Sequence, residues 1–167
     1  MGLYADQMLI EFVFRMSERV KLKKEIKKEA QKEKGKKGTQ QEAYMSETDY
    51  VKMFQSEDGT RIDIIFDVVD DKVMAIGEKM NAINEEAYMN GYNWEAFLHY
   101  YLAQNAPEVL EGLVADPEAD MYAAFYEATQ ENREKAGKFV EIIRSLIDNE
   151  KELYRILQEE GAEIEWD

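Results

Sequence analysis

The chain has 167 residues, of which 45% are hydrophobic and 34% charged, with 36 Asp and Glu, 21 Lys and Arg, one His and no Cys. This length predicts a core that needs no disulfide or metal staple. The lack of Cys excludes disulfides, thiolate metal sites and cysteine nucleophiles. The formal charge of −15 argues against a surface that holds nucleic acid, because affinity for phosphates rests on Lys and Arg, and it favours a basic partner.

The charge divides the chain near residue 40. Residues 1–40 hold eleven Lys and Arg against six Asp and Glu, a balance of +5, so the remaining residues sum to −20. Apolar residues recur there at three- and four-residue steps, which predicts a long amphipathic helix over about residues 3–34. We therefore predict a basic helical arm and linker over residues 1–40 and an acidic domain over residues 41–167.

The N-terminus does not have the features of a secretory signal. Its apolar stretch, Met8 to Phe14, follows Asp6, is interrupted by Glu11 and leads to no small-residue cleavage site. No run of about 18 apolar residues occurs elsewhere. We expect a cytoplasmic protein with no stable membrane insertion.

Alternating apolar residues predict a small antiparallel sheet. Residues 49–69 have the pattern of a hairpin, and Asp58-Gly59 between its strands fits a type I′ turn with two positive φ angles. A largely buried strand is predicted near residues 121–128, with a helix as the alternative because alanine suits both. The tail from residue 163 to residue 166 alternates again and predicts a short edge strand.

Helical spacing predicts that most of the remaining sequence is helical. Asn93 is the expected N-cap of a helix over residues 94–105, and Pro107 is expected to open a short helix that reaches Val114. Thr129 is expected to cap a long helix, and Asn149 a last helix that ends at Gly161. The stripes expected to face the core are Val73, Ile76, Met80 and Ile83, then Trp94, Phe97, Leu98, Tyr101 and Leu102, then Ala136, Phe139, Val140, Ile143, Leu146 and Ile147, and finally Leu153, Ile156 and Leu157.

The predicted fold class is therefore α+β. It is helix-rich, with a small antiparallel sheet made of the hairpin near residues 49–69 and the strand near residues 121–128. The long N-terminal helix precedes it.

The sequence favours no reaction centre. His99 lies four residues after Glu95, whereas the Glu-x-x-His metal motif needs three, so an enzyme using this pair is a minor hypothesis. Acidic residues occupy the first, third, fifth and twelfth positions of a calcium-loop template, but Met121 replaces its glycine, which favours a solvated acidic turn. These template residues are Asp116, Glu118, Asp120 and Glu127. We expect no catalytic residue, metal ion or cofactor.

Aromatic side chains with a polar end are concentrated in one segment. Five Tyr and Trp residues fall within fourteen residues, from Tyr88 to Tyr101, and such rings anchor protein interfaces as well as cores. Charge and expected exposure select a set of candidate partner contacts, whereas Trp94 is expected to hold the core. The candidate contacts are Glu85, Glu86, Asn90, Tyr92, Asp116, Glu118 and Asp120.

Several blocks of the sequence resemble a known family. They are the run from Glu86 to Leu98, which contains Asn90-Gly91-Tyr92-Asn93-Trp94, then Tyr101-Leu102, Asp116-Pro117-Glu118-Ala119 and Ile164-Glu165-Trp166-Asp167. Their order and spacing resemble the immunity protein 51 family of bacterial polymorphic-toxin systems over roughly residues 45–167. Nothing in the first 40 residues belongs to the pattern.

The resemblance implies a cytoplasmic protein without catalytic activity that binds and neutralises a cognate toxin domain and so protects the producing cell. A basic toxin, a nuclease being one class, would suit the acidic domain, because carboxylates can imitate a phosphate backbone. The alternative is a non-enzymatic adaptor or structural module whose basic N-terminal helix docks on a membrane or protein partner. Glu residues interleaved with the Lys of that helix favour a solvated helix instead.

Overall fold

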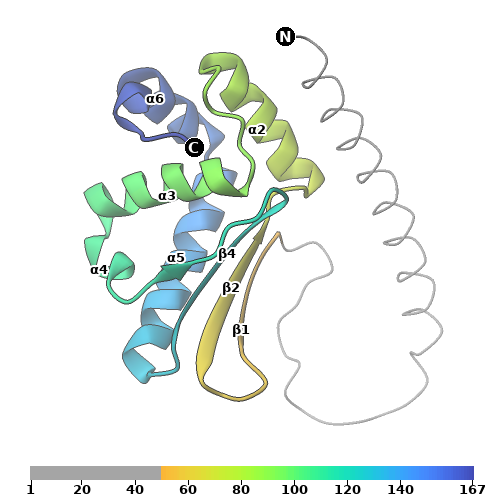
Figure 1. The fold of residues 1–167 in the computed structure, drawn as a ribbon. Helices are drawn as coiled ribbons and strands as arrows, with labels where there is room; N and C mark the ends of the chain where they lie inside the picture. Colours follow the sequence, from red (N-terminus) through yellow and green to blue (C-terminus); the bar gives the residue numbers. More distant parts are fainter. Residues whose placement is uncertain (1–49) are drawn as a thin grey trace, which may run out of the picture. The chain divides into compact units, whose positions relative to one another are not determined.

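The structure, a computed structural model, describes residues 50–167 (Figure 1). The predicted N-terminal helix and the boundary near residue 40 lie outside the described residues and stay predictions. The described elements confirm an α+β fold with an antiparallel sheet. In chain order they are β1 (Val51–Gln55), β2 (Arg61–Asp67), α2 (Asp71–Ile83), α3 (Gly91–Asn105), α4 (Pro107–Leu110), β3 (Val114–Ala115), β4 (Met121–Glu127), α5 (Gln130–Asp148), α6 (Glu150–Glu160) and the 3-10 turn η1 (Gly161–Glu163).

The sheet has the strand order β1-β2-β4-β3, with every neighbouring pair antiparallel. The hairpin prediction is confirmed by β1 and β2, in which Val51 is paired with Phe66. The strand alternative for residues 121–128 is also confirmed, because β4 lies inside the sheet between β2 and β3. Sequence reasoning missed β3, a two-residue strand too short for any alternation to appear.

Helices α3 and α5 cover the same face of the sheet. Trp94 of α3 meets Phe66 of β2 edge-on, with ring centroids 5.1 Å apart, and Phe139 of α5 meets Tyr122 of β4 at 6.0 Å. These four rings are almost fully buried, and each contributes on the order of 1.5–3 kcal/mol by leaving water. Figure 1 shows α5 running along the sheet, where it contacts β1, β2 and β4.

The predicted core stripes are largely confirmed. Thr129 caps α5, because its hydroxyl accepts a hydrogen bond from the Asn132 amide at 3.1 Å. The apolar stripes of α5 and α6 are buried throughout. Two residues depart from the prediction: Ile83, in the last turn of α2, is 37% exposed, and Tyr101 is only half-buried.

The prediction of a type I′ turn between β1 and β2 is wrong. Of the residues in the loop only Gly59 has a positive φ, at 72°. Asp58 acts through its side chain instead, accepting hydrogen bonds from the Ser56 hydroxyl at 2.6 Å and from the amide and hydroxyl of Thr60 at 3.0 and 2.8 Å. These bonds to the charged form lower the pKa of Asp58 to about 2. The side-chain hydrogen bonds of Asp58 to Ser56 and Thr60 thus stabilise a loop that is longer than a two-residue turn.

Two helix boundaries also differ from the sequence prediction. Asn90, not Asn93, caps α3, because its side-chain oxygen accepts the Asn93 amide at 2.9 Å. Asn93 is buried in the first turn, where an N-cap residue would not lie. The short helix α4 ends at Leu110 and does not reach Val114, since Gly112 adopts a φ of 78° and turns the chain into β3.

The predicted C-terminal edge strand is wrong. After α6 the chain continues at Gly161 with helical φ and ψ and makes the turn η1. Ile164 is buried, and the indole N–H of Trp166 donates to the Gly161 carbonyl at 3.1 Å, which folds the tail back on η1. The alternating apolar residues, Ile164 and Trp166, therefore attach an irregular segment to the domain and do not form a strand.

Candidate functional site

The start of α3 lies directly against the loop that precedes β4. A Cβ atom at Gly91 would come within 1.9 Å of the Glu118 carbonyl and 2.1 Å of the Met121 carbonyl, so only glycine permits this approach. The two candidate contact sets, residues 85–92 and residues 116–120, are thus brought together at one end of α3. Sequence spacing placed them in separate turns and gave no sign of this contact.

The connection from α2 to α3 presents an exposed tyrosine between buried neighbours. Tyr88 is 73% exposed, whereas Ala87 and Met89 on either side of it are buried. Met89 adopts a φ of 52°, which is unfavourable for a residue other than glycine. Its Cβ packs against Gly77 of α2, so closely that a Cβ added at Gly77 would lie only 3.0 Å from it. The loop is therefore fixed from inside, and Tyr88 points outward from a rigid base.

The predicted contact residues differ in exposure. Tyr92 is 39% exposed and Asn90, which caps α3, is half-buried. Asp120 is half-buried as well, whereas the other members of the set are exposed. The exposed acidic members are Glu85, Glu86, Asp116 and Glu118. Sequence reasoning left out Tyr88, although the density of tyrosines in this segment was the signal for it.

A groove of about 580 Å³ separates α3 from the C-terminal tail. One wall is a single face of α3, because its residues recur at three- and four-residue steps. The other wall is the segment after α6, which sequence reasoning did not include in the site. The α3 wall consists of Tyr92, Glu95, Ala96, His99 and Tyr100, and the tail wall of Glu163, Glu165, Trp166 and Asp167.

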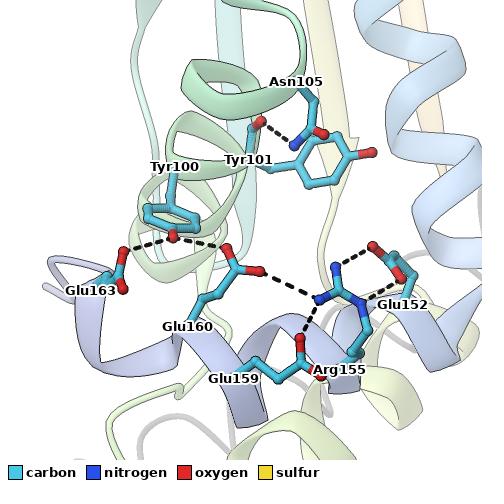
Figure 2. Close-up of polar contacts among 8 residues, drawn as sticks. All are labelled: Tyr100, Tyr101, Asn105, Glu152, Arg155, Glu159, Glu160 and Glu163. Atoms are coloured by element: carbon cyan, nitrogen blue, oxygen red, sulfur yellow. Dashed lines mark hydrogen bonds and ion pairs between the residues drawn. The ribbon is translucent and has the colours of Figure 1, made fainter.

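A second hollow, of about 350 Å³, adjoins this groove between α3 and α6 and shares Tyr100 and Glu163 with it (Figure 2). The Tyr100 hydroxyl donates to Glu160 at 2.8 Å and to Glu163 at 3.1 Å. The hydrogen bond to Glu160 raises the pKa of Tyr100 to about 12 because it holds the phenol in its protonated form, and desolvation and Glu163 act in the same direction. Arg155 enters the same hollow and pairs with Glu152 at 2.7 Å and with Glu160 at 3.5 Å.

His99 forms the inner part of the groove. Its Nε2 lies 3.1 Å from the hydroxyl of the buried Tyr122, and its Nδ1 lies 4.0 Å from a Glu95 carboxylate oxygen. Burial lowers the pKa of His99, and burial together with the nearby Asp167 carboxylate raises the pKa of Glu95. The prediction that Glu95 and His99 share a helix face is confirmed. The hydroxyl that contacts the imidazole belongs to Tyr122, whose side chain is fully buried.

Two stretches of the described domain contain no Lys or Arg. The sequence has no Lys or Arg between Lys79 and Arg133, and none after Arg155. These two base-free stretches contribute α3, the loop before β4 and the C-terminal tail. The lack of bases in these stretches is visible in the sequence, whereas only the fold shows that α3 and the C-terminal tail line one groove.

Within residues 50–167, no group of three or more His, Asp and Glu side chains is placed to hold a metal ion. The candidate calcium ligands do not form a loop, because Glu127 ends β4 and Glu118 is bridged to Met121. No helix of the described part is long and apolar enough to cross a membrane. The groove beside α3 is lined by carboxylates and by the rings of Tyr92, Tyr100 and Trp166.

A family model described as immunity protein 51 matches residues 52–162, and the chain belongs to this family. The matched range includes α3 and the loop before β4, and so confirms the resemblance seen in the sequence blocks. No curated protein and no solved structure matches the chain.

Proposed function

We propose that this protein binds a cognate toxin domain stoichiometrically, covers its working surface and so protects the cell that produces both. The observation that carries the proposal is that residues 80–132, which include α3, hold several acids and no Lys or Arg, in a member of an immunity protein family. Surfaces of one charge attract partners of the opposite charge and accelerate their encounter. The toxin is accordingly basic, and a nuclease is the class that best fits, because nucleases hold phosphates with Lys and Arg.

The contact surface that we propose has an aromatic centre and an acidic rim. Tyr88 and Tyr92 supply rings that are held by a rigid loop and by the first turn of α3. Such residues contribute most of the binding energy in protein interfaces, whereas rim charges mainly set the association rate. The rim consists of the predicted residues Glu85, Glu86, Asn90, Asp116, Glu118 and Asp120.

Co-expression with the product of the adjacent gene tests this function. Cells that make the candidate toxin should die, and cells that also make the full chain should survive. A matched chain carrying Glu85→Lys, Glu86→Lys and Glu118→Lys is the control for the surface. Equal death with and without the wild-type chain contradicts the proposed function.

The adaptor alternative depends on residues 1–40, which lie outside the described residues. Deleting them separates the two functions, because the toxin contacts proposed above all lie between residues 85 and 120. We expect the truncated chain to protect as well as the full chain in the cytoplasm, where the toxin would meet it. Loss of all protection by a truncated chain that still folds would favour the adaptor.

A further inference from the structure

The two hollows beside Tyr100 have similar linings, but only the hollow next to α6 contains an arginine side chain of the described domain. Both are bordered by tyrosine rings and glutamates. In the hollow next to α6, the guanidinium of Arg155 lies among Glu152, Glu159 and Glu160 (Figure 2). No Lys or Arg of the described residues lines the groove next to the tail. Arg155 thus shows which group such a lining accommodates.

Carboxylates line both walls of the groove, and no Lys or Arg of residues 50–167 lies among them. Glu95 on α3 and Asp167 on the tail are close enough for Asp167 to raise the pKa of Glu95. Glu163 and Glu165 add two further carboxylates to the same wall. Repulsion among like charges at the edge of a low-dielectric groove is relieved when a cation enters.

The aromatic lining selects the kind of cation. Tyr92, Tyr100 and Trp166 border the groove, and Trp166 is fixed by its hydrogen bond to Gly161. A planar guanidinium stacks on such rings while its five N–H donors reach carboxylates in its plane. An ammonium group is more strongly hydrated and gains less from this arrangement.

We propose that the groove between α3 and the C-terminal tail is a receptor for an arginine side chain of the toxin. The inference rests on the proposed function, because it names the part of the toxin that enters the surface. The arginine would lie between the rings of Tyr92 and Trp166 and be paired by Glu95, Glu165 and Asp167. In a toxin that acts on phosphates, an arginine held in this way is removed from its substrate.

Nuclear magnetic resonance of the full chain tests the groove without the toxin. The protein has one histidine and two tryptophans, so the imidazole of His99 and the indole of Trp166 report from the groove, and buried Trp94 is an internal control. Nα-acetyl-arginine amide should shift the His99 and Trp166 signals in a saturable way and leave Trp94 unchanged. It should also lower the pKa of His99, because the guanidinium opposes a charged imidazole that already faces Glu95 and Tyr122.

Two comparisons can overturn the proposal: the arginine probe against a lysine probe, and a groove variant against a control variant. Nα-acetyl-lysine amide should bind more weakly, and an equal response to both probes contradicts a site for arginine. The double variant Glu165→Gln/Asp167→Asn should lose the response, whereas Glu78→Gln/Glu141→Gln, which removes two exposed acids elsewhere, should keep it. No saturable shift in the wild-type chain, or the same shift in both variants, overturns the groove site.

The toxin-level test keeps the two proposals apart. Glu165→Gln/Asp167→Asn should weaken binding of the toxin about tenfold or more, and Glu78→Gln/Glu141→Gln much less. A wild-type chain that fails to protect contradicts the proposed function whatever the probe binds. A chain that protects and binds the toxin equally well with and without the groove carboxylates contradicts only the arginine receptor.

Discussion

Two sides of the same small domain use charge in opposite ways. On the side of α2, α5 and α6, bases pair with acids of neighbouring elements, as in Lys72 with Asp148 at 2.6 Å and Lys79 with Glu150 at 2.9 Å. Neither α3 nor the loop before β4 contains a Lys or Arg, and no such side chain of residues 50–167 lines the groove beside the C-terminal tail. The comparison shows that acids of α5 and α6 are paired with bases of α2, whereas the groove carboxylates have no described base in the same lining.

The largest expected effect comes from Gly91→Ala. The new Cβ would overlap the carbonyls of Glu118 and Met121, so α3 and the loop before β4 must separate. We expect a loss of about 3 kcal/mol in the free energy of unfolding, measured by urea denaturation. Gly137→Ala is the matched control on α5, where no atom lies within 4 Å of the added methyl, and it should stabilise the helix by up to about 1 kcal/mol. Equal effects at both positions contradict the tight contact.

The next effect is on binding alone. Tyr88→Ala should cost about 2 kcal/mol of toxin binding free energy, measured by calorimetry, because an exposed ring on a rigid loop has the properties of an interface anchor. Its free energy of unfolding should change by less than about 0.5 kcal/mol. Phe54→Ala, at a ring on β1 that is 50% exposed, should affect binding little. If Phe54 is the residue whose loss matters, the interface lies on the sheet and not at α3.

Charge reversal at the rim should change the association rate. Glu86→Lys and Glu118→Lys together should slow association about tenfold at low salt, with little change in dissociation, because rim charges act during the encounter. Stopped-flow measurements over a range of salt concentrations check this. Glu78→Lys and Glu141→Lys together, on α2 and α5, are the control because they change the net charge by the same amount. Association that stays fast in high salt and after reversal contradicts electrostatic steering.

On the side of α2, α5 and α6, removing a single ion pair should have a modest effect on the free energy of unfolding. A double-mutant cycle of Lys72→Ala and Asp148→Ala should give a coupling of about 0.2–1 kcal/mol in the free energy of unfolding, because both side chains are more than half exposed. Toxin binding should be unchanged in all three variants. A loss of binding here would place the interface on the side where the charges are already neutralised.

The smallest expected effect is a pH dependence centred on His99. Burial lowers its pKa below the ordinary 6.5, so the fold favours the neutral imidazole. The stability gained in this way is complete above pH 6.5 and is lost as the pH falls through the lowered pKa of the folded state. His99→Gln should flatten that part of the stability curve, measured by denaturation at several pH values. An unchanged slope would assign the dependence to other groups, such as Glu95.

The sequence by itself determined the local elements and the class of the fold. Alternation along residues 61–67 and 121–127 specified two strands, and three- and four-residue spacing specified the buried stripes of α5 and α6, because burial of one face imposes these periods. The sequence also showed a strong negative net charge of −15 and no arrangement of residues that favours a reaction centre. Its blocks from Glu86 to Asp167 carried the family resemblance that the match over residues 52–162 confirmed.

Only the tertiary structure decided how these parts meet. The absence of a side chain at Gly91 allows the loop before β4 to lie against α3, and two anchors in the tail, Ile164 and Trp166, hold it beside η1 rather than in the sheet. Neither contact has a periodic signature, because each depends on one residue fitting against a segment distant in the chain. The acidic sequence predicts a basic partner, while packing decided that carboxylates and aromatic rings of α3 and of the C-terminal tail line one groove.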